Sequence, residues 1–497
     1  MFAWGLTVCV WLLLAASPIW AQGTQPQTPA EPPQTQNSAP AAQPQKPPEE
    51  PAGTKPEAAT EETKISPAEA QELFRSIDQI LRFASKDTGF PIKHEVKRRL
   101  IDRDEVATYL ERQTTEAEDA KRLRRSETVL KKFGLLPRDF DLGPFLVALL
   151  KEQVAGYYDP KTKTVNLLDW VDPDRQKPVM AHELTHALQD QSFNLEKYMK
   201  AANVDLDKKR EVTPADIGND EIGTARQAVV EGQAMVVLLD YMLAPMGESV
   251  EDAPELVRAL KDTMLLGTAD SPEFAKAPIY MKEALTFPYR YGIDFVTTVL
   301  AKAGKEKAYP GLFENPPRTT RQIMEPETYL SGEQLEPMLL PDFKKIFKGY
   351  ERFDIGAVGE LDVAVLVDQY ADIPTSRALY PHWRGGYYYA VRPKGDTTGP
   401  LGLVYVSRWS SSEKAAEFAA IYAKGMTERY KRVQGSATLP DLHALLTLTG
   451  KHTWQTEDGP VVINAKGNSI LITESLDQAI TNQLEQAVFG MAAVAGH

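Results

Sequence analysis

Cysteine is almost absent from this 497-residue chain: the only one, Cys9, lies in an apolar stretch near the N-terminus. A single cysteine cannot form an internal disulfide. If the N-terminal stretch is removed, the chain keeps no thiol, which excludes a cysteine nucleophile and a thiolate metal site. The lack of thiols suits an oxidising compartment.

Positive charge is also scarce. The chain has 56 Lys and Arg against 69 Asp and Glu, a formal net charge of -13, and its pI is about 5.3. A nucleic-acid groove needs an excess of Lys and Arg on one face to neutralise phosphates, so we expect no nucleic-acid partner. Long apolar runs are missing after the N-terminal stretch, and we expect no later membrane span.

The N-terminal region differs in composition from the rest. "MFAWGLTVCVWLLLAASPIWAQG" is apolar from Leu6 to Ala16, and its last residues resemble a cleavage site before Gln22. We expect residues 1–21 to be a secretory signal peptide and the protein to be exported to the periplasm or beyond. Because no Lys or Arg precedes the apolar run, an uncleaved membrane anchor is the alternative. Residues 22–64, rich in Pro, Gln, Ala and Glu, predict a disordered tether to the cell envelope or a passive spacer.

The remaining sequence predicts an α+β protein of more than one domain, because it exceeds the length of a single core. Helical periodicity begins at "SPAEAQELFRSIDQILRFASK". The segment "VKRRLIDRDEVATYL" predicts a short strand and then a helix that Asp102 caps, and "QVAGYY" and "KTVNLLD" predict a β-hairpin around "DPKT". We expect a mainly helical domain with a small β-hairpin or sheet over residues 65–345, and a connector over residues 346–370.

Residues 371–497 predict a small α+β domain of two ββα units. The strands "GGYYYAVR" and "GLVYVSRW" precede a helix opened by Ser410, with Glu413 at capping-box spacing. "PVVINAKGNSILIT" predicts a hairpin through Gly467-Asn468, and a helix follows Ser475. The aromatic residues of this region are typical of core and cross-strand packing, and we expect an interaction or packing role for it.

The stretch "VMAHELTHALQDQ", residues 179–191, has the spacing of a metal site. On a helix, residues i and i+4 share a face, so His182 and His186 can direct two imidazole nitrogens at one ion while Glu183 reaches its bound water. The other residues of the stretch are mostly apolar, which predicts a helix with one face on the core and its polar face toward a cleft. The alternative is a solvated helix that has two histidines by chance.

A catalytic zinc ion needs a third protein ligand and an open position for water. Glu231 is the only acid in the apolar middle of a second predicted helix, over residues 221–243. A lone carboxylate there is costly to bury unless it is paired or binds a metal, and Gly232 beside it allows another helix to approach closely. Glu231 follows His186 by 45 residues, enough for a loop and a returning helix. We expect Glu231 to complete a site for one zinc ion per chain.

These motifs resemble those of the gluzincin metallopeptidases, whose zinc ligands are the two histidines of the motif and a Glu on a downstream helix. The chain is more closely similar to a group of bacterial exported proteins with the motifs "GYYDP", "AHELTHALQDQ", "EG.A", "FPY..G" and "PP..T.QI", over about residues 83–329. The resemblance implies a zincin-like fold and a peptide or protein substrate. It implies zinc ligation by His182, His186 and Glu231, with Glu183 as the general base.

The chain departs from this pattern at two positions. The resemblance leads us to expect a His in "PPRTTRQIMEP", where this chain has Met324, and an acid two residues after the ligand Glu, where it has Gln233. We expect these differences to change the contacts to the transition state and the support of the metal ligands. The ligands themselves are intact.

The expected reaction is hydrolysis of a peptide bond. The metal lowers the pKa of its water and polarises the scissile carbonyl, and Glu183 accepts a proton and returns it to the leaving amine. A separate donor stabilises the oxyanion, and of the two tyrosines in "EALTFPYRYGIDFV", Tyr289 and Tyr291, we favour Tyr289. The strand "KTVNLLD" is expected to border the cleft and to pair with an extended peptide.

Two other functions fit the same sequence. A catalytically silent binding protein can keep a structural metal, but such a relative would usually lose the general base, and Glu183 is present. An amide hydrolase that acts on cell-wall peptides would use the same groups. The other histidines predict surface or packing positions: His94, His382, His443, His452 and His497.

Overall fold

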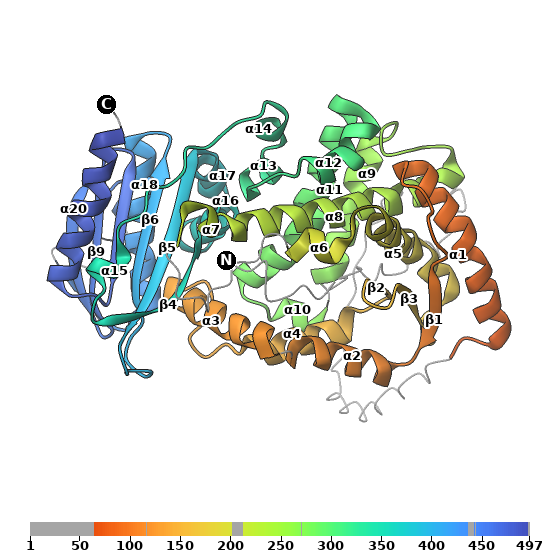
Figure 1. Cartoon of the computed structure of the whole chain (residues 1–497), viewed down its shortest axis with the longest axis horizontal. Helices are drawn as coiled ribbons and strands as arrows, with labels where there is room; N and C mark the ends of the chain where they lie inside the picture. Colours follow the sequence, from red (N-terminus) through yellow and green to blue (C-terminus); the bar gives the residue numbers. More distant parts are fainter. Residues whose placement is uncertain are drawn as a thin grey trace, which may run out of the picture.

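The computed structural model describes residues 64–115, 117–200, 212–269, 271–435, 442 and 444–495. The expected signal peptide and all but the last residue of the expected tether lie outside these residues. The described chain is α+β, as predicted, with a helical part, a small sheet at one end and a larger sheet at the other (Figure 1). Long helices run between the two sheets.

The helical part combines long helices with helices of only four to six residues. Its first helix begins at Pro67 because the Ser66 and Glu69 side chains form a reciprocal capping box. The helices are α1 (Pro67–Thr88), α2 (Arg103–Thr115), α3 (Ala117–Phe133), α4 (Leu142–Gln153), α5 (Pro173–Phe193), α6 (Leu195–Lys200), α7 (Pro214–Ile217), α8 (Asn219–Leu243), α9 (Pro254–Ala269), α10 (Pro272–Ala275), α11 (Ile279–Ala308), α12 (Pro310–Glu314), α13 (Thr320–Met324), α14 (Pro326–Leu330) and α15 (Phe343–Ile346), with the 3-10 turn η1 (Ala244–Met246) after α8.

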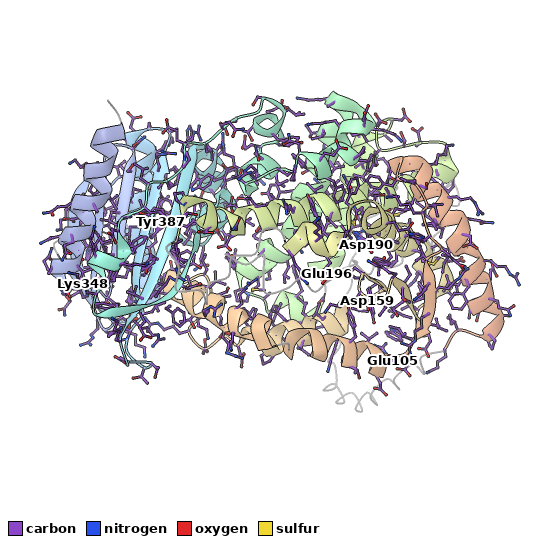
Figure 2. The ribbon with its side chains drawn as sticks, viewed as in Figure 1. Glu105, Asp159, Asp190, Glu196, Lys348 and Tyr387 are labelled. Atoms are coloured by element: carbon purple, nitrogen blue, oxygen red, sulfur yellow. The ribbon has the colours of Figure 1, made fainter. Side chains whose placement is uncertain are left out.

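The small sheet has three strands, β1 (Lys97–Ile101), β2 (Tyr157–Asp159) and β3 (Thr164–Leu168), in the order β1-β3-β2. The predicted hairpin is confirmed, since β2 and β3 pair antiparallel, and Figure 2 labels Asp159 at the end of β2. Asp102 caps α2 as predicted, accepting from the Glu105 backbone N–H at 3.0 Å. β1 pairs parallel with β3, so both edges of β3 are occupied. The prediction that a peptide pairs with this strand is therefore wrong.

Helix α5 contains the HExxH stretch and extends beyond residues 179–191 at both ends. It begins at Pro173, where the Asp172 side chain accepts from two backbone N–H groups of the first turn, so Pro178 lies inside the helix. From Met180 to Asp190 every residue is buried. The polar face of α5 is thus buried within the structure together with its apolar face.

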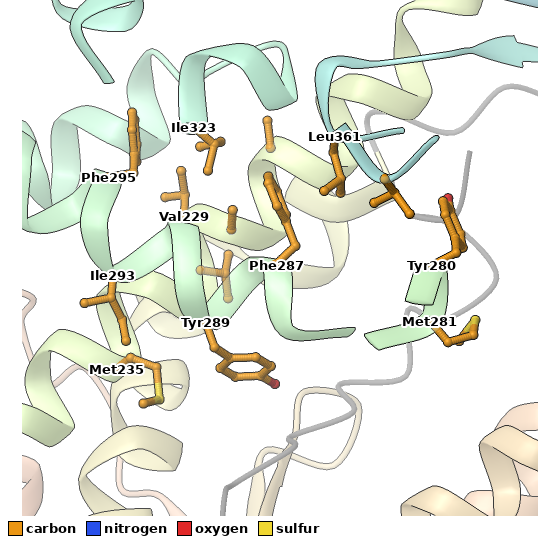
Figure 3. Close-up of a cluster of buried hydrophobic side chains, with 14 of the residues drawn as sticks. Val229, Met235, Tyr280, Met281, Phe287, Tyr289, Ile293, Phe295, Ile323 and Leu361 are labelled. Atoms are coloured by element: carbon orange, nitrogen blue, oxygen red, sulfur yellow. The ribbon is translucent and has the colours of Figure 1, made fainter. Parts of the chain in front are cut away.

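Helix α8 contains Glu231 and lies against both α5 and α11. Together with η1, Asn219–Met246, it is the one described helix that is long and apolar enough to cross a membrane, but 72% of its most apolar window is buried inside the structure. Such burial is typical of a core helix. Figure 3 shows the apolar cluster here, with Val229 and Met235 from α8 beside Ile293 and Phe295 from α11.

The crossing of α8 and α11 depends on two glycines. A Cβ added at Gly232 would lie 2.6 Å from the carbonyl carbon of Gly292, and a Cβ added at Gly292 would lie 2.5 Å from the carbonyl oxygen of Ala228. Only glycine fits such a backbone contact. The prediction that Gly232 allows a close helix approach is confirmed, and Glu231 is directly adjacent to it.

The larger sheet has seven antiparallel strands in the order β4-β5-β6-β10-β9-β8-β7. Helices α16 (Glu360–Tyr370) and α18 (Ser412–Arg429) cover one face and α20 (Gln478–Ala495) the other, and α17 (Ile373–Leu379) with the 3-10 turn η2 (Tyr380–His382) leads into β5 (Figure 1). The strands are β4 (Tyr350–Ala357), β5 (Trp383–Pro393), β6 (Gly402–Trp409), β7 (Val433–Gly435), β8 (Gly450–Thr456), β9 (Gly459–Lys466) and β10 (Ser469–Glu474).

The structure corrects two details of this region. The range expected to be a connector, residues 346–370, contains β4 and α16. The strands of both predicted ββα units belong to one sheet together with β4 and β7. The helix after β6 is capped by Ser411 rather than Ser410, since its side chain accepts from the backbone N–H of Lys414. The hairpin through Gly467-Asn468 is confirmed.

The aromatic residues of β5 are packed in the core, as predicted. Tyr387 and Tyr389 point to the face covered by α15 and α20, where the Tyr389 ring stacks on Phe343 with centroids 3.9 Å apart (Figure 2 labels Tyr387). Tyr388 points to the opposite face and meets Phe133 of α3 at 6.0 Å. This alternation follows from the two-residue period of a strand.

A buried carboxylate joins the helical part to the larger sheet. Glu221, in the first turn of α8, accepts hydrogen bonds from the backbone N–H of Thr320 at 2.8 Å and from its hydroxyl at 2.9 Å. The same hydroxyl lies 3.2 Å from the backbone N–H of Leu361 in α16, which donates to it. Burial, reinforced by the charge of Asp362, raises the pKa of Glu221 to about 7.

We predict that Gly232→Ala destabilises the protein by about 1–3 kcal/mol, because the new methyl group forces α8 and α11 apart. The matched control is Gly143→Ala in α4, where an added Cβ meets no atom within 4 Å. We expect the control to be neutral or stabilising by at most about 1 kcal/mol. Denaturant unfolding of the three proteins measures the difference, and equal stability of the two variants would contradict the prediction.

Glu221 predicts a dependence of stability on pH. Its folded-state pKa of about 7 lies above the ordinary glutamate value of 4.5. The contribution of the protonated Glu221 to stability is therefore fully present below the unfolded-state pKa and is lost as pH rises through the folded-state pKa. We predict that the midpoint temperature of unfolding decreases as the pH is raised from about 5 to about 8. Ionisation of Glu221 accounts for up to about 3 kcal/mol of the lost stability. Thermal unfolding of Glu221→Gln should show a flatter profile, whereas Glu306→Gln at an exposed position of α11 should match the parent.

Candidate metal centre

Three side chains from two helices converge between α5 and α8. His182 Nε2 lies 3.4 Å from Glu231 Oε2, and His186 Nε2 lies 3.9 Å from the same oxygen. One potential ligand atom from each residue lies within 4.8 Å of the others, and all three residues are buried. This group can hold a metal ion, and it is the only such group among the residues that the structure describes.

The imidazoles are kept neutral by their surroundings. Burial lowers the pKa of His182 to about 3, and burial together with the neighbouring His182 lowers the pKa of His186 well below its usual range. Their rings are nearly perpendicular, with centroids 4.5 Å apart and an interplanar angle of 78°. Neutral imidazole is the form that binds metals.

Glu183 lies beside this group but is held by the small sheet. Its Oε2 accepts a hydrogen bond from the backbone N–H of Tyr158 in β2 at 2.8 Å. Burial raises the pKa of Glu183 well above its usual range, although the Tyr158 N–H opposes the shift. A carboxylate with a raised pKa is suited to accept and return a proton.

The Glu231 carboxylate has a neighbour that the sequence suggested for another role. Tyr289 donates a side-chain hydrogen bond to Glu231, which partly opposes the increase in the pKa of Glu231 caused by burial. Tyr289 is 5% exposed, and in Figure 3 its hydroxyl points away from Val229 and Phe287 at the margin of the apolar cluster. The structure therefore brings Tyr289 to the metal group, next to a ligand. Tyr291 lies half-buried, with its ring near Phe287.

The buried carboxylates favour a cation at this position. Within the described part of the chain, Glu231 Oε2 and Glu183 Oε1 are buried and have no hydrogen-bond donor. Burial raises the pKa of both groups, and two such oxygens near two neutral imidazoles lack the positive charge that would stabilise their ionised forms. A divalent cation supplies that charge, so the residues present fit a metal ion.

Polar residues after the second histidine support the site, although sequence reasoning assigned no separate role to them. His186 Nδ1 lies 2.7 Å from Gln189 Oε1, and Gln189 also contacts Gln233 at 3.0 Å. Gln233, which stands where the resemblance leads us to expect an acid, is fully buried within the site. The motif in the sequence gave the signal, since "HALQDQ" places a polar residue one turn after His186, but the partner on α8 cannot be read from spacing.

Asp190 joins the end of α5 to the small sheet. It accepts hydrogen bonds from the Tyr158 hydroxyl at 2.7 Å and from Lys163 Nζ at 2.5 Å, and its other oxygen accepts from the Leu195 backbone N–H at 3.1 Å. Figure 2 labels Asp190 beside α5, close to the strands of the small sheet. Tyr158 thus binds α5 twice, through its hydroxyl at Asp190 and its backbone N–H at Glu183.

The remaining residues singled out from the sequence lie elsewhere. His94 is exposed, His382 contacts Ser410 at 2.8 Å, and His452 stacks near Trp454 at 5.8 Å. His443 and His497 lie outside the described residues. Met324 is the last residue of α13 and packs half-buried against the core. The surface or packing positions expected for His94, His382 and His452 are confirmed.

The candidate metal centre thus consists of the two neutral imidazoles of His182 and His186, the buried carboxylate of Glu231 and the adjacent carboxylate of Glu183, which β2 holds. Comparisons with protein-family models, with curated proteins and with solved structures found no match to this chain.

Proposed function

We propose that this protein is a zinc-dependent peptidase that hydrolyses peptide bonds with Glu183 as the general base. The observation that carries the proposal is the buried group of His182, His186 and Glu231, whose ligand atoms lie within 4.8 Å of one another. Two imidazoles and one carboxylate are a ligand set of catalytic zinc sites that keep a position open for water. The sequence resemblance to gluzincins supports zinc as the ion.

Each residue of the site then has a defined task. A bound zinc ion would supply a Lewis acid that polarises the scissile carbonyl and acidifies a water molecule. Glu183 accepts the proton of the attacking water and passes it to the leaving amine. The Tyr158 N–H holds Oε2 of Glu183, which leaves Oε1 as the oxygen that exchanges the proton.

Tyr289 has two tasks that its position supports. Its hydrogen bond to Glu231 orients this ligand, and its hydroxyl lies at the margin of the apolar cluster rather than within it. A hydroxyl next to the metal group can also donate to an oxyanion when substrate is bound. We propose that Tyr289 orients Glu231 in the free protein and contributes to oxyanion stabilisation during the reaction.

We propose that the substrate backbone lies along β2 rather than β3. β2 is one of the two edge strands of the small sheet, next to β3 in the order β1-β3-β2. The Tyr158 N–H points to Glu183 and not to β3, so the outer edge of β2 faces the general base. An extended peptide that runs past this edge would bring its backbone to the base, while the Tyr158 N–H stays bonded to Glu183. The arrangement of α5, α8 and this sheet supports a zincin-like fold.

The proposal predicts about one zinc ion per purified chain. Glu231→Gln removes the charge of a ligand at constant size and should lose most of the metal. Glu221→Gln is the matched control, because it changes another buried Glu of the same helix and should retain the metal. Elemental analysis after zinc supplementation measures both. A folded parent protein without zinc, or equal zinc in the two variants, would contradict the prediction.

The second prediction concerns the reaction itself. Glu183→Gln keeps an oxygen to accept from the Tyr158 N–H but cannot act as a base, so zinc content and fold should persist while peptide hydrolysis falls by about 100-fold or more. The assay is cleavage of a library of unfolded peptides and of cell-wall peptides, followed by mass spectrometry. If the zinc-loaded parent is as inactive as Glu183→Gln on both sets, a metal-containing binding protein takes the place of the peptidase.

A further inference from the structure

The amide side chain of Gln233 has only one orientation that satisfies its neighbours. One end of this side chain lies 2.8 Å from the carbonyl oxygen of Ala308 and 3.0 Å from that of Tyr309, at the C-terminal end of α11. Carbonyl oxygens only accept hydrogen bonds, so this end must be the NH2 group. The oxygen of Gln233 therefore faces the other way, toward α5.

The orientation of Gln189 follows from the same rule. One end of its side chain lies 3.0 Å from the Val230 carbonyl oxygen and 3.0 Å from the Gln233 oxygen. Both neighbours are acceptors, so this end is the NH2 group and both of its hydrogens are used. Gln189 Oε1 must then face His186 Nδ1, at 2.7 Å. Both amides are fully buried, with 0% exposure, so water does not compete for these bonds.

We propose that Gln189 and Gln233 are positioning residues that fix the tautomer of His186, a role that rests on the metal binding in the proposed function. An amide oxygen cannot donate, so His186 Nδ1 must carry the proton. A neutral imidazole has one N–H, and the lone pair of Nε2 is left for the metal. The carbonyl oxygens at the end of α11 orient Gln233, and Gln233 orients Gln189. Gln189 in turn determines which nitrogen of His186 is available to bind the metal.

The same chain of contacts explains why residue 233 is an amide. A carboxylate there would place an oxygen against the carbonyl oxygens of Ala308 and Tyr309, with no hydrogen to share. Gln233 donates to both and accepts from Gln189, so every hydrogen-bonding group of its side chain has a partner. The departure from the gluzincin-like pattern at this position is therefore matched to the end of α11 in this chain.

Two substitutions of Gln189 separate this role from packing. Gln189→Met has similar length but no acceptor for His186 Nδ1. Gln189→Glu keeps an oxygen opposite Nδ1 in either protonation state and loses the amide donor to Val230 and Gln233. If the residue only packs α5 against α8, Gln189→Glu should be at least as harmful as Gln189→Met. If it sets the tautomer, Gln189→Glu should be the milder change.

The test is nitrogen-15 NMR of histidine-labelled, metal-free protein, in which the two ring nitrogens report the tautomer directly. The chain has seven histidines, so His186 can be assigned by difference from a His186→Asn variant. We expect Nδ1–H at His186 in the parent and in Gln189→Glu, and an increase of Nε2–H in Gln189→Met. Zinc affinity, measured by competition with a chelator, should fall by about 10–100-fold in Gln189→Met and by much less in Gln189→Glu.

Nε2–H at His186 in the metal-free parent overturns the proposal, even if Gln189→Met fails to fold. Equal loss of zinc affinity in both variants, with an unchanged tautomer, also overturns it. Neither measurement uses peptide hydrolysis. An inactive parent with the expected tautomer and zinc affinity would therefore remove the peptidase and leave this inference standing.

Discussion

The contact between the backbones of α8 and α11 determines where the third ligand lies. At Gly232 and Gly292 the two helices touch without intervening side chains, so α8 has little freedom to rotate or slide. Glu231 is one residue from this contact, and its direction toward α5 is fixed by it. Helix α11 also supplies the Tyr289 hydroxyl and, at its C-terminal end, the carbonyl oxygens that orient Gln233. A metal group assembled from separate helices thus depends on one tight crossing.

Several buried polar groups around this crossing are matched to partners. Leaving a buried polar group unpaired costs about 1–3 kcal/mol, and residues such as Gln189, Gln233 and Glu221 avoid this cost through contacts with backbone groups of other helices. At the metal group, by contrast, one oxygen each of the described residues Glu183 and Glu231 has no hydrogen-bond donor. These two unmatched acceptors beside two neutral imidazoles are the physical reason to consider a cation there.

Much of the fold could be predicted where the signals are local. The cap at Asp102 and the turn at Gly467-Asn468 each depend on residues close in sequence. The gathering of His182, His186 and Glu231 followed from helical spacing and from the cost of a lone buried acid. These signals are strong because each rests on a single physical requirement.

What the sequence could not predict depends on partners far along the chain. β1 pairs with β3, which lies more than 60 residues further along the chain, as at Lys97 and Thr164. No local feature of either strand indicates that the other is its partner. β4 has an irregular register between Arg352 and Asp354, which breaks the alternation by which strands are recognised. The role of Gln233 needs the end of α11. Spacing can predict which residues share a face, but not which carbonyl oxygen they meet.

The position of β4 determines where the chain can be cut to obtain a separate C-terminal region. β4 is the edge partner of β5 and also supplies Asp354, which accepts from the Tyr388 hydroxyl at 2.8 Å. A fragment that starts at residue 371 would expose the backbone groups of β5 and leave a buried tyrosine without its acceptor, and bare strand edges of this kind favour aggregation. A useful boundary for the C-terminal region lies before Tyr350, and the sequence pattern alone would have placed the cut inside the sheet.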